Sequence, residues 1–83
     1  MINTYRHLLF AASQYDPLST EYFRIVRAVS SYDHLIQRWY DDPQSRPQLE
    51  PLIEQTRQWC VEIQYAITNQ TKIPALREIE KIR

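Results

Sequence analysis

The stretch STEYFRIVRAVSSYDHLIQRWYD, residues 19–41, carries the clearest structural pattern in the chain. Its apolar residues recur at alternating intervals of three and four, which places them on one face of an α-helix. Ser19 supplies a side-chain oxygen that can cap the first turn, and Glu21 places a negative charge where the helix dipole favours it. The pattern predicts a long amphipathic helix from Ser19 to about Asp41. Its core face consists of Tyr22, Ile25, Val29, Tyr32, Ile36 and Trp39.

A second long helix is predicted over residues 48–69, because its apolar residues follow the same rhythm. Its core face consists of Leu49, Leu52, Thr56, Trp59, Ile63 and Ala66. Between the two helices, residues 42–47 contain two prolines and no aliphatic residue, which is typical of a connecting loop. Two amphipathic helices joined by a short loop should pack as an antiparallel hairpin.

Shorter helices are predicted at both ends of the chain. One runs from Asn3, a plausible N-cap, to about Tyr15, where Asp16 and Pro17 interrupt it. The other begins near Pro74, which suits a first helical turn. Its apolar residues are Ile73, Leu76, Ile79 and Ile82. The sequence therefore predicts an all-α fold: an antiparallel long-helix hairpin with short N- and C-terminal helices, forming a small helical bundle in a single domain, 1–83.

The composition narrows the class of protein. The 83 residues include no glycine, which disfavours tight β-hairpins and excludes glycine-rich phosphate-binding loops. Ten basic and ten acidic side chains cancel, whereas nucleic-acid-binding proteins usually carry a positive excess. A single cysteine, Cys60, indicates a reducing compartment, and no apolar run is long enough for a signal peptide or a membrane span. We expect a cytoplasmic protein that binds no membrane.

Catalytic and metal-binding motifs are not apparent in the sequence. His7, His34 and Cys60 fall on different predicted helices and lack the paired spacing of zinc ligands. Cys60 borders an apolar stripe, where cysteines behave as small inert hydrophobic residues. We therefore expect no metal, no cofactor and no enzymatic activity.

One face of the residue 19–41 helix is basic. Arg24, Arg27, Ser31, His34 and Arg38 share it, opposite the apolar stripe. We call this set the basic ridge, and we expect its three arginines to face solvent. The ridge can be a solvated helix face, a contact for an acidic protein, or a contact for phosphates, since guanidinium groups suit both carboxylates and phosphates.

Several apolar residues lie outside the predicted core faces. Val61 and Tyr65 are four residues apart and point away from the core. Phe23 likewise lies outside the core face of the residue 19–41 helix. The C-terminal helix can cover Val61 and Tyr65, or these residues can contact another molecule. The wide apolar face of the residue 19–41 helix also favours a two-fold homodimer.

The sequence thus predicts a non-enzymatic protein-interaction module: a small helical adaptor, regulator or inhibitor whose partner is another protein of unknown identity. Its predicted partner-binding residues are Val61, Tyr65, Phe23, Arg24, Arg27, His34 and Arg38. The alternative is a nucleic-acid-binding protein that uses the basic ridge. We further expect Trp39 and Trp59 to be largely buried, because both lie on core faces.

Overall fold

A computed structural model of the chain describes residues 5–76 and contains three α-helices within that range. They are α1 (Leu8–Ala12), α2 (Thr20–Asp41) and α3 (Arg46–Asn69), with a short 3₁₀-helix, η1 (Pro43–Ser45), between the two long ones. Residues 5–76 include no strand. The all-α prediction is confirmed.

Helix α2 begins and ends where its sequence pattern predicts. The Ser19 hydroxyl caps it by accepting a hydrogen bond of 3.2 Å from the Tyr22 N–H, and it donates to the Asp16 carbonyl at 2.6 Å. At the other end, Asp42 leaves the helical conformation while its N–H still bonds to the Arg38 carbonyl. Local capping chemistry therefore sets both limits of α2.

Helix α3 ends at Asn69 as predicted but begins two residues earlier than expected, at Arg46. Pro47 fits in the first turn because its missing N–H has no helical partner there. The expected loop is correspondingly shorter, and residues 43–45 form η1. The Arg46 side chain reinforces the turn by donating from Nε to the Trp39 carbonyl at 2.8 Å.

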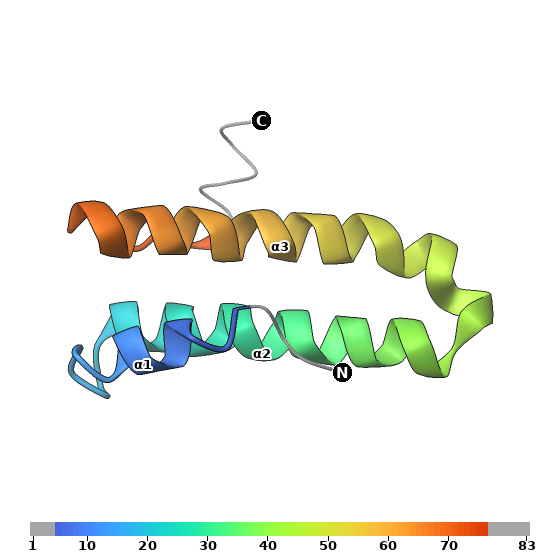
Figure 1. Ribbon diagram of the computed structural model, residues 1–83, viewed down its shortest axis with the longest axis horizontal. Helices are drawn as coiled ribbons and strands as arrows, with labels where there is room; N and C mark the ends of the chain where they lie inside the picture. Colours follow the sequence, from blue (N-terminus) through green and yellow to red (C-terminus); the bar gives the residue numbers. More distant parts are fainter. Residues whose placement is uncertain (1–4, 77–83) are drawn as a thin grey trace.

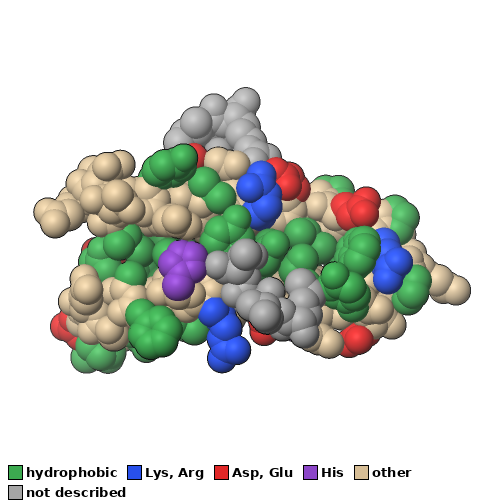
Figure 2. Space-filling view, in the orientation of Figure 1, with side chains coloured by type: hydrophobic (Ala, Val, Ile, Leu, Met, Phe, Trp, Pro, Cys, Tyr) green, Lys and Arg blue, Asp and Glu red, His purple; other side chains and the backbone are tan. Residues whose placement is uncertain are grey.

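The two long helices lie side by side, and the chain reverses direction at η1 (Figure 1). We call the η1 side the loop end of this pair and the opposite side the open end. Helix α1 packs against α2 towards the open end, in front of the pair in this view, whereas the segment that follows α3 passes behind it. Figure 2 shows apolar side chains gathered along the seam between the long helices, on the face that carries α1.

The N-terminal helix is shorter than predicted. It spans five residues, and the backbone on both sides forms turns of three-residue spacing, with Leu8 N–H bonding to the Tyr5 carbonyl and Tyr15 N–H to the Ala12 carbonyl. The proposed cap, Asn3, lies outside the described residues. Even so, Leu8 and Ala12 are buried in the core, so this short segment contributes its apolar side as expected.

The predicted C-terminal helix does not begin at Pro74; Leu76 is helical. Residues 71–75 are not helical, and most of the predicted helix lies outside the described residues. Two side chains hold this segment by its carbonyl groups: Arg24 Nη1 donates to the Ile73 carbonyl at 2.7 Å, and Trp59 Nε1 donates to the Pro74 carbonyl at 2.8 Å. Ile73 is completely buried, so the non-helical residues 71–75 contribute to the core.

The main core lies towards the open end of the long-helix pair. Its buried residues are Leu8, Ala12, Ile25, Ala28, Val29, Trp59, Cys60, Ile63, Ala66 and Ile73. Two predictions fail near the loop end: Leu52 is 48% exposed, and Trp39 is only partly buried. The reason is that α1 and residues 71–76 supply additional layers only towards the open end.

Candidate functional site

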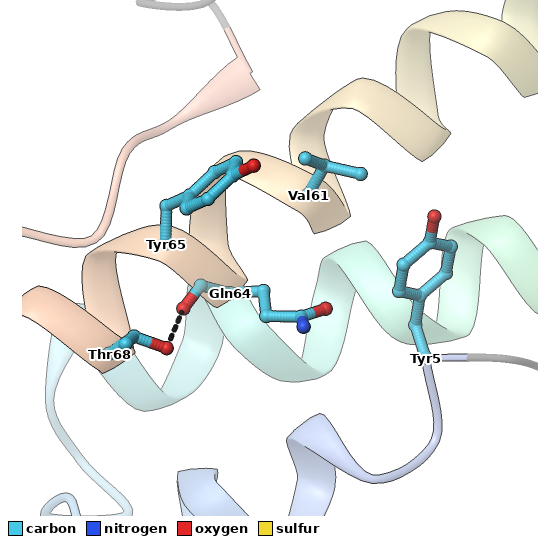
Figure 3. Close-up of a pocket in the computed structure, with 5 residues that line it drawn as sticks. All are labelled: Tyr5, Val61, Gln64, Tyr65 and Thr68. Atoms are coloured by element: carbon cyan, nitrogen blue, oxygen red, sulfur yellow. Dashed lines mark hydrogen bonds between the residues drawn. The ribbon is translucent and has the colours of Figure 1, made fainter.

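Val61 and Tyr65, predicted to face outward on α3, line a surface hollow of about 290 Å³. Gln64 and Thr68 come from the same helix, and Tyr5 comes from the segment that precedes α1 (Figure 3). We call this feature the Tyr5–Tyr65 hollow. Its lining combines apolar surface with hydroxyl and amide groups and carries no charged side chain.

Tyr5 is held in place by contacts with both long helices. Its ring packs edge-on against Tyr32 of α2, with the ring centroids 5.2 Å apart. On α3, hydrogen bonds with Glu54 and with Tyr5 raise the pKa of the Arg57 guanidinium above its ordinary value. The sequence could not indicate Tyr5 as part of the site, because more than fifty residues separate it from Val61.

The described part of the C-terminal segment does not cover the hollow. Tyr65 is 62% exposed, and residues Ile73 and Pro74 instead bond to Arg24 and Trp59. Val61 is partly buried. Within residues 5–76, the predicted intramolecular cover for Tyr65 is therefore not found, and its aromatic ring is accessible.

The basic ridge is divided by the tertiary structure. Arg27, His34 and Arg38 are exposed, and Arg27, Ser31 and His34 line an open hollow of about 500 Å³. Arg24, in contrast, is partly buried and bonds to the Ile73 carbonyl. The expectation that Arg24 faces solvent is thus wrong, because the returning segment contacts its guanidinium.

Phe23 lies beside the basic ridge on α2, close to Arg24 and Arg27. Its ring is 60% exposed, and the Arg27 guanidinium carbon lies 5.9 Å from the ring centroid, within the range of a cation–π contact. Phe23, Arg24 and Arg27 also line a pocket of about 440 Å³ together with Trp59 and Leu76. Three predicted partner-binding residues of α2 therefore meet in one place.

A groove that the sequence analysis missed lies near the loop end. Ile36, Trp39 and Tyr40 of α2 line it with Glu50, Ile53 and Glu54 of α3, around a volume of about 350 Å³. The Arg46 guanidinium carbon lies 4.0 Å from the Trp39 ring centroid, and Trp39 Nε1 approaches Glu50 Oε2 at 3.4 Å. The sequence did carry one sign of this groove: Trp39 and Tyr40 are adjacent aromatic residues in the last turn of α2, just before the proline-containing turn.

Charges are distributed unevenly between the two long helices. Within residues 5–76 the one ion pair joins Arg57 to Glu54, both on α3, so neither Arg27 nor Arg38 has a carboxylate within 4.0 Å among the described residues. The exposed side of α2 therefore carries cationic groups without an acidic partner in the described part of the chain. Glu50 and Glu54 are exposed on α3.

Cys60 has the environment of a structural cysteine. It is completely buried, and burial raises the pKa of its thiol to about 12. At neutral pH it is therefore protonated and poorly nucleophilic. In the described range, no three potential metal ligands cluster together, and none of the helices is long and apolar enough to cross a membrane.

Comparisons of this chain with protein-family models, with curated proteins and with solved structures give no match.

Proposed function

We propose that this chain is a non-enzymatic protein-interaction module, an adaptor, regulator or inhibitor built on a small antiparallel helical bundle. The observation that supports this function best is the 62% exposure of Tyr65 beside Val61 and Tyr5 in one hollow. Tyrosine is enriched at protein interfaces because its large rigid ring buries much area at low entropic cost and its hydroxyl can still bond.

The lining of the hollow suits an uncharged side chain of a partner protein. Val61 and the rings of Tyr5 and Tyr65 offer apolar contact, while Gln64 and Thr68 supply polar groups at its edge. The Thr68 hydroxyl donates to the Gln64 carbonyl at 3.0 Å, which fixes its orientation (Figure 3). We propose that an aliphatic or aromatic side chain of the partner inserts between Tyr5 and Tyr65.

Affinity capture from the organism that encodes the chain tests this function. The bait is the full chain, compared with Tyr65→Glu and with the matched variant Tyr40→Glu, since Tyr40 is also exposed, at 56%, but lies near the loop end. We expect a protein that the parent and Tyr40→Glu retain and that Tyr65→Glu loses, followed by direct binding of the purified pair. A set of captured proteins identical for all three baits would contradict a role for the hollow.

A nucleic-acid-binding function is the second candidate, supported by Arg27 and Arg38, which are exposed on α2 and have no carboxylate within 4.0 Å among residues 5–76. Two observations weigh against it: Arg24 already donates a hydrogen bond to the Ile73 carbonyl, and the net charge of the chain is zero. Binding of a mixed DNA or RNA pool that weakens steeply with salt, and that Arg27→Glu with Arg38→Glu abolishes, would favour this candidate instead.

A further inference from the structure

A pocket of about 440 Å³ lies where α2, α3 and the segment after α3 meet, towards the open end of the long-helix pair (Figure 1). We call it the Phe23–Trp59 pocket, after one lining residue from each long helix. Leu76, from the segment after α3, forms part of a third wall. The pocket shares no lining residue with the Tyr5–Tyr65 hollow, so the two are separate sites.

Most of the lining of the Phe23–Trp59 pocket is apolar. The Phe23 ring is 60% exposed and Leu76 is partly buried, so both present apolar surface to solvent. Trp59, by contrast, is only 5% exposed and forms a wall rather than a platform on which a nucleic-acid base could stack. An apolar group in the pocket would therefore remove the exposed surface of Phe23 and Leu76 from water.

Two guanidinium groups share the pocket with this apolar surface. Arg24 Nη1 donates to the Ile73 carbonyl at 2.7 Å, which holds the group in place and occupies only one of its N–H donors. The Arg27 guanidinium carbon lies 5.9 Å from the Phe23 ring centroid, so the ring contacts its flat face rather than its donors. Both groups therefore retain N–H donors for an acceptor that enters the pocket.

The described part of the chain supplies no carboxylate for these two groups. None of the lining residues is acidic, and the ion pair found within residues 5–76 joins Arg57 to Glu54. A positive charge beside apolar surface attracts an anion more strongly than it does in water, because the local dielectric constant is lower. The ligand that matches both features carries an anionic oxygen group on an apolar body.

The dimensions of the pocket set the size of this ligand. Its α2 lining runs from Thr20 to Arg27, which at ~1.5 Å per residue extends over ~10 Å of the helix. Its volume of about 440 Å³ is within the range of small-molecule pockets, roughly 300–1,000 Å³. Both dimensions suit a medium-chain aliphatic acid.

We propose that the Phe23–Trp59 pocket binds a small aliphatic carboxylate, with its chain against Phe23 and Leu76 and its oxygens at Arg24 and Arg27. Arginine suits this ligand because its paired N–H groups match the two oxygens of a carboxylate. Inorganic phosphate would contact the arginines but gain nothing from the apolar walls. The site goes beyond the proposed interaction function, since it does not involve Tyr65.

Titration of the isotope-labelled full chain with octanoate, followed by heteronuclear NMR, tests the proposal. The Trp59 Nε1–H bonds to the Pro74 carbonyl beside the pocket, so its signal should shift and then saturate. The Trp39 indole signal, which Trp39→Phe identifies, is the internal control and should stay in place, because Trp39 lies near the loop end. Octanol and octylammonium should bind at least about fivefold more weakly than octanoate, because neither carries the negative charge.

Two exposed residues of the pocket can be changed without disturbing the core. Arg27→Gln and Phe23→Ala should each weaken octanoate binding by about fivefold or more, because one removes a charged donor and the other an apolar wall. The matched controls are Arg38→Gln and Phe10→Ala, which make the same changes at exposed positions outside the pocket. Both controls should bind octanoate like the parent, and circular dichroism of all four variants checks that the helices persist.

Three results would overturn the proposal. The first is the absence of a saturable shift of the Trp59 signal with octanoate. The second is equal affinity for octanoate and for octanol or inorganic phosphate, because the charge or the apolar walls would then contribute nothing. The third is an equal loss of affinity in a pocket variant and in its matched control.

Two further results would identify another occupant and also contradict the proposal. If octanoate binds only to a chain that lacks residues 77–83, those residues occupy the pocket in the full chain. If octanoate does not bind but an acetylated peptide of glutamate and leucine does, the occupant is an acidic segment of another protein. In each case loss of a captured partner on Tyr65→Glu remains a separate measurement, so failure of octanoate binding leaves the interaction function standing.

Discussion

Arg24 and Arg27 are separated by less than one helical turn, yet their guanidinium groups have different surroundings. Arg24 donates to the Ile73 carbonyl at 2.7 Å, whereas Arg27 is exposed beside the Phe23 ring. Both residues fit the same basic face in the sequence. The difference arises from a segment about fifty residues away, and it makes Arg24 a structural residue and Arg27 a surface residue.

Replacing Arg24 with Gln should lower the free energy of unfolding by about 1–2 kcal/mol, because the charged hydrogen bond to the Ile73 carbonyl is lost. Arg27→Gln is the matched control, and it should change stability by less than about 0.5 kcal/mol, as is usual for surface positions. Urea unfolding monitored by circular dichroism measures both. Equal unfolding midpoints for the two variants would show that Arg24 does not hold the segment.

Cys60 should make stability depend on pH in the alkaline range. The thiol ionises near its ordinary value of 9.0 in the unfolded chain but only near about 12 in the folded one. Between these values the unfolded state holds fewer protons, so the free energy of unfolding should fall as pH rises through this window. Cys60→Ala should lack this contribution. Measuring the free energy of unfolding against pH for the parent and for Cys60→Ala isolates it as the difference between the two curves.

Alkylation provides an independent check on Cys60. The folded protein should resist iodoacetamide at pH 8, and the same protein in concentrated urea should react fully, because only unfolding exposes the thiol. Rapid labelling of the folded protein at the same pH would contradict the burial of this side chain.

At the scale of the elements, the helix ends are set by local chemistry that differs from one end to another. Ser19 caps α2 with its side chain, and Pro47 lies in the first turn of α3, where its missing N–H has no helical partner. Gln70, the C-cap residue that follows α3, has a left-handed backbone with φ of 57°. Glycine usually occupies such a position, and this chain contains none. Gln70 therefore adopts a conformation that costs free energy for a residue with a side chain.

Gln70→Gly should stabilise the protein by about 0.5–1 kcal/mol, because glycine adopts positive φ without steric cost. Gln70→Val should destabilise it, since a β-branched residue tolerates this conformation poorly. Thermal unfolding of the two variants, compared with the parent, gives the sign of each effect. A loss of stability on introducing glycine would mean that the Gln70 side chain makes a larger contribution than its backbone strain.

At the scale of the whole molecule, the core is placed asymmetrically. Helix α1 and residues 71–76 lie on opposite sides of the long-helix pair, and together they surround Trp59 and Ile63. Towards the loop end, the long helices contact each other without these additional layers. The asymmetry leaves Trp39, Tyr40 and Leu52 partly or largely exposed.

The two tryptophans should report this asymmetry. Trp59 is 5% exposed and bonds to the Pro74 carbonyl, so Trp59→Ala should cost about 3–5 kcal/mol. Trp39→Ala should cost less, about 1–2 kcal/mol, because its ring is only partly removed from water. Chemical unfolding of both variants tests the difference. A larger cost at Trp39 would place the main core towards the loop end instead.

The sequence by itself determined the features that depend on neighbouring residues. The intervals of three and four fixed α2 and most of α3, and Ser19 and Pro43 fixed where helices begin and end, because periodicity and capping act within a few residues. The same helical geometry indicated that Val61 and Tyr65 point away from the core. The sequence pattern could not predict which helix faces are buried, because burial of a face depends on which distant segment packs against it.

Only the tertiary structure decided those long-range relations. It brought Tyr5 beside Tyr65, bound Arg24 to the Ile73 carbonyl and left Leu52 exposed, although Leu52 lies on the same sequence stripe as the buried Trp59. The physical reason is that burial depends on contacts between segments, and these contacts join residues that are about fifty or more positions apart in the chain.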